Sequence, residues 1–137
     1  MYKNILLAAD GSDNSFRAAQ ETIKLLSEDS EVTILNVLDA SKSKDEVLHS
    51  APSESIGRKR KEKLSKIEAL YRENNVTYDV QFAQGIPNET VVKHANNGTY
   101  DIVVLGSRGL NTLQEMMLGS VSHKVTKRSD IPVLIVK

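Results

Sequence analysis

The chain contains no cysteine, no tryptophan and only three prolines in 137 residues. The absence of cysteine excludes a disulfide framework, a thiolate nucleophile and cysteine-ligated metal sites. No apolar run approaches the roughly 20 residues that span a bilayer, so we expect no membrane partner. Because the first apolar run begins at Ile5 and leaves no room for a signal peptide, we expect a cytoplasmic protein.

An excess of charge of either sign is also missing. Lys+Arg and Asp+Glu are equal at 18 each, so no general attraction draws the chain toward nucleic acid. Glutamates flank the basic run at 58–61 on both sides. Aromatic residues, which would stack on bases, make up only 4% of the chain. These features favour a solvated helix face, and we expect no nucleic-acid partner. His49 and His94 have no carboxylate at ligand spacing, which argues against a structural metal.

Apolar runs alternate with helix-like segments along the whole chain. A hydrophobic content of 39% over residues 1–137 predicts one domain with a substantial core. Most runs are continuous, which is typical of parallel strands covered by helices on both faces. We therefore predict an α/β fold whose right-handed crossovers give strand order 3-2-1-4-5. The predicted strands are 5–9, 32–37, 80–83, 102–105 and 133–136, and the predicted helices are 13–27, 56–73, 87–97 and 120–128.

Local signals mark the ends of several predicted helices. Ser12 is the expected N-cap of the first helix. Pro87 is expected to begin the third, and Gly98 to stop it. The stretch 39–55 is rich in serine, lysine and aspartate, so it is the predicted mobile loop.

A glycine pattern follows the fourth predicted strand. Residues 106–109 read Gly-Ser-Arg-Gly, and Gly-Ser recurs at 119–120 after nine further residues. Glycines at a strand-to-helix junction let backbone N–H groups approach a phosphate chain, so we expect donors from Ser107 to Leu110. The free N–H groups at the start of the last helix are further expected donors. A simple turn and an ordinary N-cap serine at Ser120 remain alternatives, and neither a Walker loop nor a Gly-x-Gly-x-x-Gly motif occurs.

The predicted strand order brings a second feature to the same place. The order reverses between strands 1 and 4, which end near Asp10 and Gly106. Ligands of doubly wound sheets bind at this reversal, so the two loops are expected to form one crevice. The Asp10 carboxylate is placed to accept hydrogen bonds from ribose hydroxyls or to approach a phosphate-bound metal. Asp-Gly-Ser is alternatively a turn that enters the first helix.

These residues resemble the ATP-binding branch of the universal stress protein family. The mark of that branch is Gly-x2-Gly-x9-Gly-Ser/Thr, which Gly106, Gly109, Gly119 and Ser120 fill here. The similarity spans the whole chain, because other features follow in the family's order. They are Asp10-Gly11-Ser12, Val37, Gly85-Ile86-Pro87 and the closing run 132–136.

The resemblance implies an ATP site in which Val37 packs against the adenine and Ala8 and Ala9 admit the ring. Mg²⁺ or Mn²⁺ is expected to arrive with the phosphates. The resemblance also implies a homodimer formed through the strand at 132–136. His123 is a departure, since family members commonly carry glutamate three residues after the motif serine. The expected nucleotide-binding residues are Ala8, Ala9, Asp10, Val37, Leu105, Gly106, Ser107, Arg108, Gly109, Gly119, Ser120, Val121 and Ser122.

The implied function is that of a stress-response or signalling regulator in which bound ATP sets a conformation or a surface for a protein partner. Efficient ATP turnover is not expected, because no P-loop lysine and no evident nucleophile–base set can be found. Two alternatives remain open. One is a slow ATPase or phosphotransferase, and the other is a dimeric scaffold that holds AMP, another adenine nucleotide or none.

Overall fold

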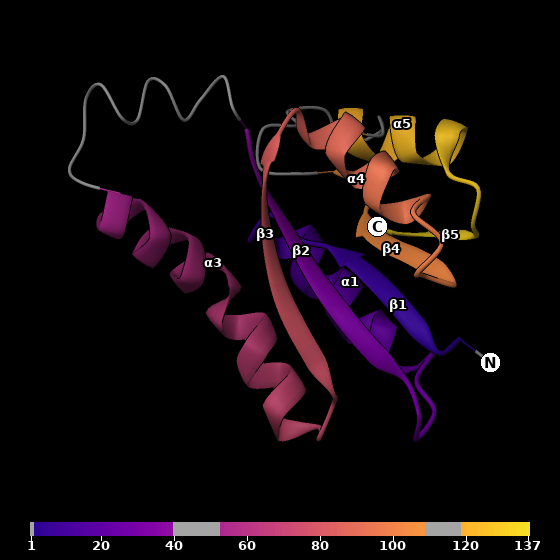
Figure 1. Cartoon of the computed structure of the whole chain (residues 1–137). Helices are drawn as coiled ribbons and strands as arrows, with labels where there is room; N and C mark the ends of the chain where they lie inside the picture. Colours follow the sequence, from indigo (N-terminus) through magenta and orange to yellow (C-terminus); the bar gives the residue numbers. More distant parts are fainter. Residues whose placement is uncertain (1, 40–52, 109–118) are drawn as a thin grey trace.

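The computed structural model describes residues 2–39, 53–108 and 119–137, without the side chains of 53–61 and 63. In this part of the chain five parallel strands form one sheet with the order β3-β2-β1-β4-β5, which confirms the predicted α/β topology (Figure 1). All four strand pairs are parallel. The strands are β1 (Asn4–Ala8), β2 (Glu31–Asp39), β3 (Tyr78–Gly85), β4 (Ile102–Gly106) and β5 (Val133–Val136).

The described helices cover both faces of the sheet. Helix α1 lies behind the sheet in Figure 1, and α4 and α5 lie together over the other face. Helix α3 packs alongside β2 and β3 on the face that α1 covers. The bounds are α1 (Asp13–Ile23), α3 (Ser53–Glu73), α4 (Pro87–Ala95) and α5 (Ser120–Arg128).

Two apolar cores result, one on each face of the sheet. Along β1, Ile5 and Leu7 belong to the core beneath α1 and α3, whereas Leu6 belongs to the core beneath α4 and α5. Strand β4 alternates in the same way. Because both faces are covered, the interiors of β1 and β4 are fully buried, as their continuous apolar sequences predict. The edge strand β3 instead has only half-buried and exposed positions.

The predicted N-cap of α1 is present. The Ser12 hydroxyl oxygen accepts a hydrogen bond from the Ser15 N–H at 3.1 Å, which satisfies one donor of the first turn. The preceding Gly11 has φ +86°, a conformation that glycine adopts without steric cost. Together these residues turn the chain from β1 into α1 at the carboxyl end of the sheet.

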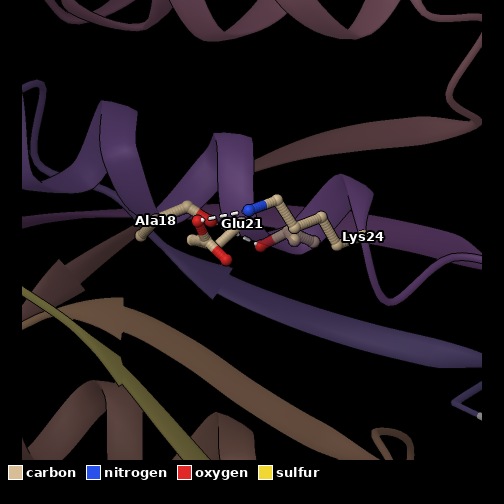
Figure 2. A network of polar contacts seen from close by, with 4 residues as sticks. Ala18, Glu21 and Lys24 are labelled. Carbon is tan, nitrogen blue, oxygen red and sulfur yellow. Dashed lines mark hydrogen bonds and ion pairs between the residues drawn. The ribbon is translucent and has the colours of Figure 1, made fainter.

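Helix α1 ends at Ile23, earlier than the predicted 27. The N–H groups of residues 24–26 bond to carbonyls three positions back, at 3.1, 2.9 and 3.2 Å, so the last turn tightens into a 3₁₀ form. At this end the Lys24 ammonium reaches back to the Glu21 carboxylate at 2.9 Å (Figure 2). The two side chains are 72% and 44% exposed, so this ion pair contributes little to stability.

Other boundaries also shift by a few residues. Helix α3 begins at Ser53, and β2 continues to Asp39, so both ends of the predicted loop 39–55 are regular structure. Residues 40–52 lie outside the described part of the chain. Helix α4 begins with Pro87 as predicted but ends at Ala95, where Asn96 forms the C-cap before Gly98 at φ +89°.

Candidate functional site

The loops that follow β1 and β4 lie next to each other at the carboxyl edge of the sheet. The two strands pair in register, with Ala8 opposite Leu105. From there the chain enters α1 on one face and leads toward α5 on the other. The convergence of the Asp10 and Gly106 loops, expected from the strand order, is therefore present in the structure.

Gly106 lies directly against the first turn of α1. A Cβ atom built at this position would lie 2.7 Å from Asn14 Cβ, 3.0 Å from its carbonyl carbon and 3.1 Å from its carbonyl oxygen. Because Asn14 is buried and two of these atoms are backbone, the helix cannot give way easily. Glycine at this position is thus required for packing, a reason that the sequence pattern does not reveal.

The Ser107 backbone joins three elements. Its N–H donates to the Val136 carbonyl of β5 at 2.8 Å, because parallel pairing continues one residue beyond β4. Its carbonyl accepts from the Gly119 N–H at 2.7 Å and from the Ser122 hydroxyl at 2.8 Å. The expectation that the Ser107 N–H is available to phosphate is therefore wrong, since β5 occupies it. Ser107 instead anchors the start of α5 to the end of β4.

Helix α5 begins at Ser120, with Gly119 as its N-cap at φ −67° and ψ 165°. Gly119 provides no side chain to cap the helix, so Ser120 is the first helical residue and the ordinary N-cap alternative for it is wrong. The first backbone donor with an intrahelical partner is the His123 N–H, which bonds to the Gly119 carbonyl at 2.9 Å. The N–H groups of residues 120–122 precede it and have no partner within the helix. Negative charge is favoured at such a terminus.

The side chains of this first turn differ in exposure. Ser122 is buried, and its hydroxyl donates either to the Ser107 carbonyl at 2.8 Å or to the Gly119 carbonyl at 3.0 Å. Only its backbone N–H therefore remains for a ligand, while the Ser120 side chain is exposed. With Gly119 as N-cap, the third helical residue is Ser122. His123 thus lies one position beyond the glutamate position of a capping box, and its side chain is exposed.

Asp10 occupies the turn between β1 and α1. Its Oδ1 accepts a hydrogen bond from the Ser12 N–H at 2.9 Å, so the Asp-Gly-Ser turn expected as an alternative role is present. The residue is half-buried at the carboxyl end of β1. The same carboxylate group therefore shapes the loop and lies at the edge where the predicted crevice is located.

The other predicted site residues have mixed surroundings. Ala9 is buried. Its N–H donates to the Leu35 carbonyl at 3.0 Å, and its carbonyl accepts from the Asn36 side-chain amide at 2.9 Å.

The remaining predicted site residues differ in burial. Val37 and Ala8 are half-buried and pack against the core beneath α4 and α5, to which the buried Leu105 belongs. Arg108 and Val121 are half-buried. Gly109 lies outside the described residues.

A cavity of about 240 Å³ opens on the opposite face, between the start of α1 and the middle of α3. Its lining includes Asp13, Phe16, Lys66 and Ile67. The start of α5 lies on the other side of the sheet, so this cavity is separate from the predicted phosphate position.

Among the residues that the structure describes, no three histidine or acidic side chains gather to hold a metal ion. Within the same residues, no helix is both long and apolar enough to cross a membrane. The side chains of the basic run 58–61 lie outside the described set.

Comparison with known proteins identifies the family. The model of the universal stress protein family matches residues 1–137. Universal stress protein YxiE of Bacillus subtilis is 34% identical over 149 residues, with 100% of each chain covered. The solved structure of MJ0577, a universal stress protein of Methanocaldococcus jannaschii, is 32% identical and superposes with a TM-score of 0.87, covering 100% of this chain and 96% of that chain.

A solved universal stress protein in complex with cAMP is 25% identical and superposes with a TM-score of 0.64, covering 99% of this chain and 97% of that one. The family model covers the entire sequence, and the strand order and the glycine motif agree with it. The chain belongs to the universal stress protein family.

Proposed function

We propose that this chain binds ATP at the carboxyl edge of β1 and β4 and acts as a nucleotide-dependent stress-response or signalling regulator. The observation that supports this best is the anchored start of α5. The Ser107 carbonyl holds both the Gly119 N–H and the Ser122 hydroxyl, so the N–H groups of residues 120–122 are fixed beside the end of β4. An anchored helix terminus of this kind binds phosphate through aligned donors without reorganising.

The other residues fit an adenine nucleotide. Asp10 lies at the end of the neighbouring strand β1, where its carboxylate would accept hydrogen bonds from the ribose. Val37, half-buried on β2, would offer an apolar surface to the adenine. Mg²⁺ or Mn²⁺ bound to the phosphates would neutralise part of their negative charge. This arrangement binds and orients the nucleotide, and we propose that any hydrolysis is slow or depends on a partner.

Calorimetric titration of Mg-ATP into the parent chain and two variants tests the proposal. Ser120→Asp adds a negative charge at the exposed first position of α5, which favours the helix but repels phosphate. Ser120→Asn has nearly the same shape without the charge. We expect binding by the parent, a loss of at least tenfold in Ser120→Asp, and a smaller loss in Ser120→Asn. No binding by the parent, or equal affinity in all three proteins, would contradict the proposal.

The same titration with ADP, AMP and cAMP determines the class of nucleotide. A solved relative is a complex with cAMP, so cyclic and linear phosphates both need to be compared. We expect ATP to bind most tightly, because three phosphates present more negative charge to the donors of α5. Tighter binding of AMP or cAMP would replace ATP as the proposed ligand while keeping the same site.

We also propose that the chain forms a homodimer through β5. This strand is last in the sheet order, and all four of its residues are only partly buried. An apolar edge strand presents backbone groups that pair readily with a second copy across a twofold axis.

A further inference from the structure

One polar side chain next to α5 is incompletely bonded. Asn88 is the second residue of α4, and its Nδ2 donates to the Ser120 Oγ at 3.4 Å. Its Oδ1 is buried and has no hydrogen-bond partner, the one such side-chain atom in the described part of the chain. A buried oxygen without a donor lowers stability, so the position of Asn88 calls for an explanation.

Helix α4 lies beside α5, and side-chain contacts join the two helices near both ends. The Glu89 carboxylate lies 3.4 Å from the Lys124 ammonium. At the other end of α4, the Asn96 amide donates to the Arg128 carbonyl at 2.9 Å and accepts from the Asp130 N–H at 2.7 Å. The two helices therefore run parallel, and their first turns are aligned.

The Asn88 contact favours one direction for the Ser120 hydroxyl proton. A serine hydroxyl has one proton and two lone pairs. When Oγ accepts a hydrogen bond from Asn88, its own proton is directed away from Asn88. Ser120 is exposed at the N-terminus of α5, so this proton is available to an anion bound there. The 3.4 Å separation is long, as polar contacts at binding sites often are before the ligand arrives.

We propose that Asn88 is a positioning residue that orients the Ser120 hydroxyl as a donor to nucleotide phosphate. The inference rests on the proposed function, and it assigns to α4 a part in phosphate binding through Ser120. The resulting chain of donors runs from Asn88 Nδ2 to Ser120 Oγ and from the Ser120 hydroxyl to a phosphate oxygen. Because the amide turns its nitrogen toward Ser120, its Oδ1 is left buried without a hydrogen-bond donor.

A double-mutant cycle with Asn88→Ala and Ser120→Ala tests the inference, with affinities for Mg-ATP measured by calorimetry. We expect Ser120→Ala to bind ATP about ten- to a hundredfold more weakly, the usual effect of losing one hydrogen bond to a charged group. Asn88→Ala should lose part of the same affinity, because it leaves the hydroxyl in place without its partner. The double variant should match Ser120→Ala, because Asn88 acts only through that hydroxyl. Additive losses, or no loss in Asn88→Ala, would overturn the inference.

Asn88→Asp provides a second variant of nearly the same shape. A carboxylate accepts hydrogen bonds but does not donate, so it would draw the Ser120 proton to itself and repel phosphate. We expect this variant to bind ATP more weakly than Asn88→Ala. An affinity equal to that of the parent would overturn the proposed direction of the hydrogen bond.

Adenosine separates positioning from a general structural effect. It carries no phosphate, so its affinity should be the same in the parent and in Asn88→Ala. Equal weakening of adenosine and ATP would show that Asn88 supports only the fold and would overturn the inference. If the parent binds ATP but Asn88→Ala behaves like it, the inference fails while the proposed function stands. If the parent binds no nucleotide, both fail.

Discussion

Gly106 is the residue at which packing and the proposed site meet most directly. Its missing side chain lets the first turn of α1 approach β4, and an added Cβ would lie 2.7 Å from Asn14 Cβ. We expect Gly106→Ala to lower the free energy of unfolding by roughly 1–3 kcal/mol, the usual cost of overpacking, because the contacts include backbone atoms. Urea unfolding measures this change, and a free energy within 0.5 kcal/mol of the parent would contradict it.

Asp101 makes stability depend on pH at the opposite edge of the sheet. The N–H groups of Asn4 and Lys3 each donate to its Oδ2 at 2.9 Å, which lowers the pKa of Asp101 below its usual value. A carboxyl with a lowered folded-state pKa stabilises the fold above its unfolded pKa of about 3.9 and loses this effect as pH falls through the folded value.

The titration of Asp101 is tested with Asp101→Asn, which keeps an oxygen acceptor but cannot titrate. We expect the unfolding temperature of the parent to fall more steeply than that of the variant as pH drops from about 5 to 3. At pH 7 the parent should be the more stable, because the charged acceptor binds the two N–H groups more strongly. Thermal unfolding followed by circular dichroism checks both points, and parallel pH profiles would contradict the assignment.

At the scale of elements, the sequence predicted the topology but not every boundary. Continuous apolar runs such as Ile102–Leu105 identify strands covered on both faces, and right-handed crossovers then leave few possible orders. The early end of α1 could not be predicted, because it depends on a change from i−4 to i−3 hydrogen bonding. The edge position of β3 explains why its pattern is the least continuous.

The candidate site was also predictable in part. The strand order was sufficient to bring Asp10 and Gly106 together, since both follow neighbouring strands. The contact of Gly106 with Asn14 and the use of the Ser107 N–H by β5 depend on residues distant in sequence, so no local pattern shows them. Asn88 was missed for the same reason. Its spacing to Ser120 becomes meaningful only when α4 and α5 lie side by side.

For the whole molecule, the proposed nucleotide site and the proposed dimer edge share one residue. The Ser107 N–H bonds to Val136 of β5, while its carbonyl bonds to the start of α5. A phosphate held by α5 and a second copy paired with β5 would therefore act on the same short backbone segment. If both proposals hold, this connection would link a bound nucleotide directly to the proposed subunit edge.

The outward-facing backbone of β5 offers a selective test of the dimer. The carbonyls of Pro132 and Val136 accept hydrogen bonds from β4 and the residue after it, so alternation turns the Ile135 N–H toward the free edge of the sheet. Ile135→Pro removes this outward donor and keeps the bonds to β4. Ile135→Ala is the control, because it shortens the side chain but retains the N–H.

We expect the parent and Ile135→Ala to sediment as dimers at micromolar concentration and Ile135→Pro to sediment as a monomer with its helical circular dichroism unchanged. Proline has no backbone N–H, so the β5 strand of a second copy would lose one of the hydrogen bonds that join the two edge strands. Sedimentation velocity distinguishes the two states. A monomeric parent, or a proline variant that dimerises like the parent, would show that β5 is not the subunit edge. Loss of the dimer in Ile135→Ala as well would assign the contact to side-chain packing.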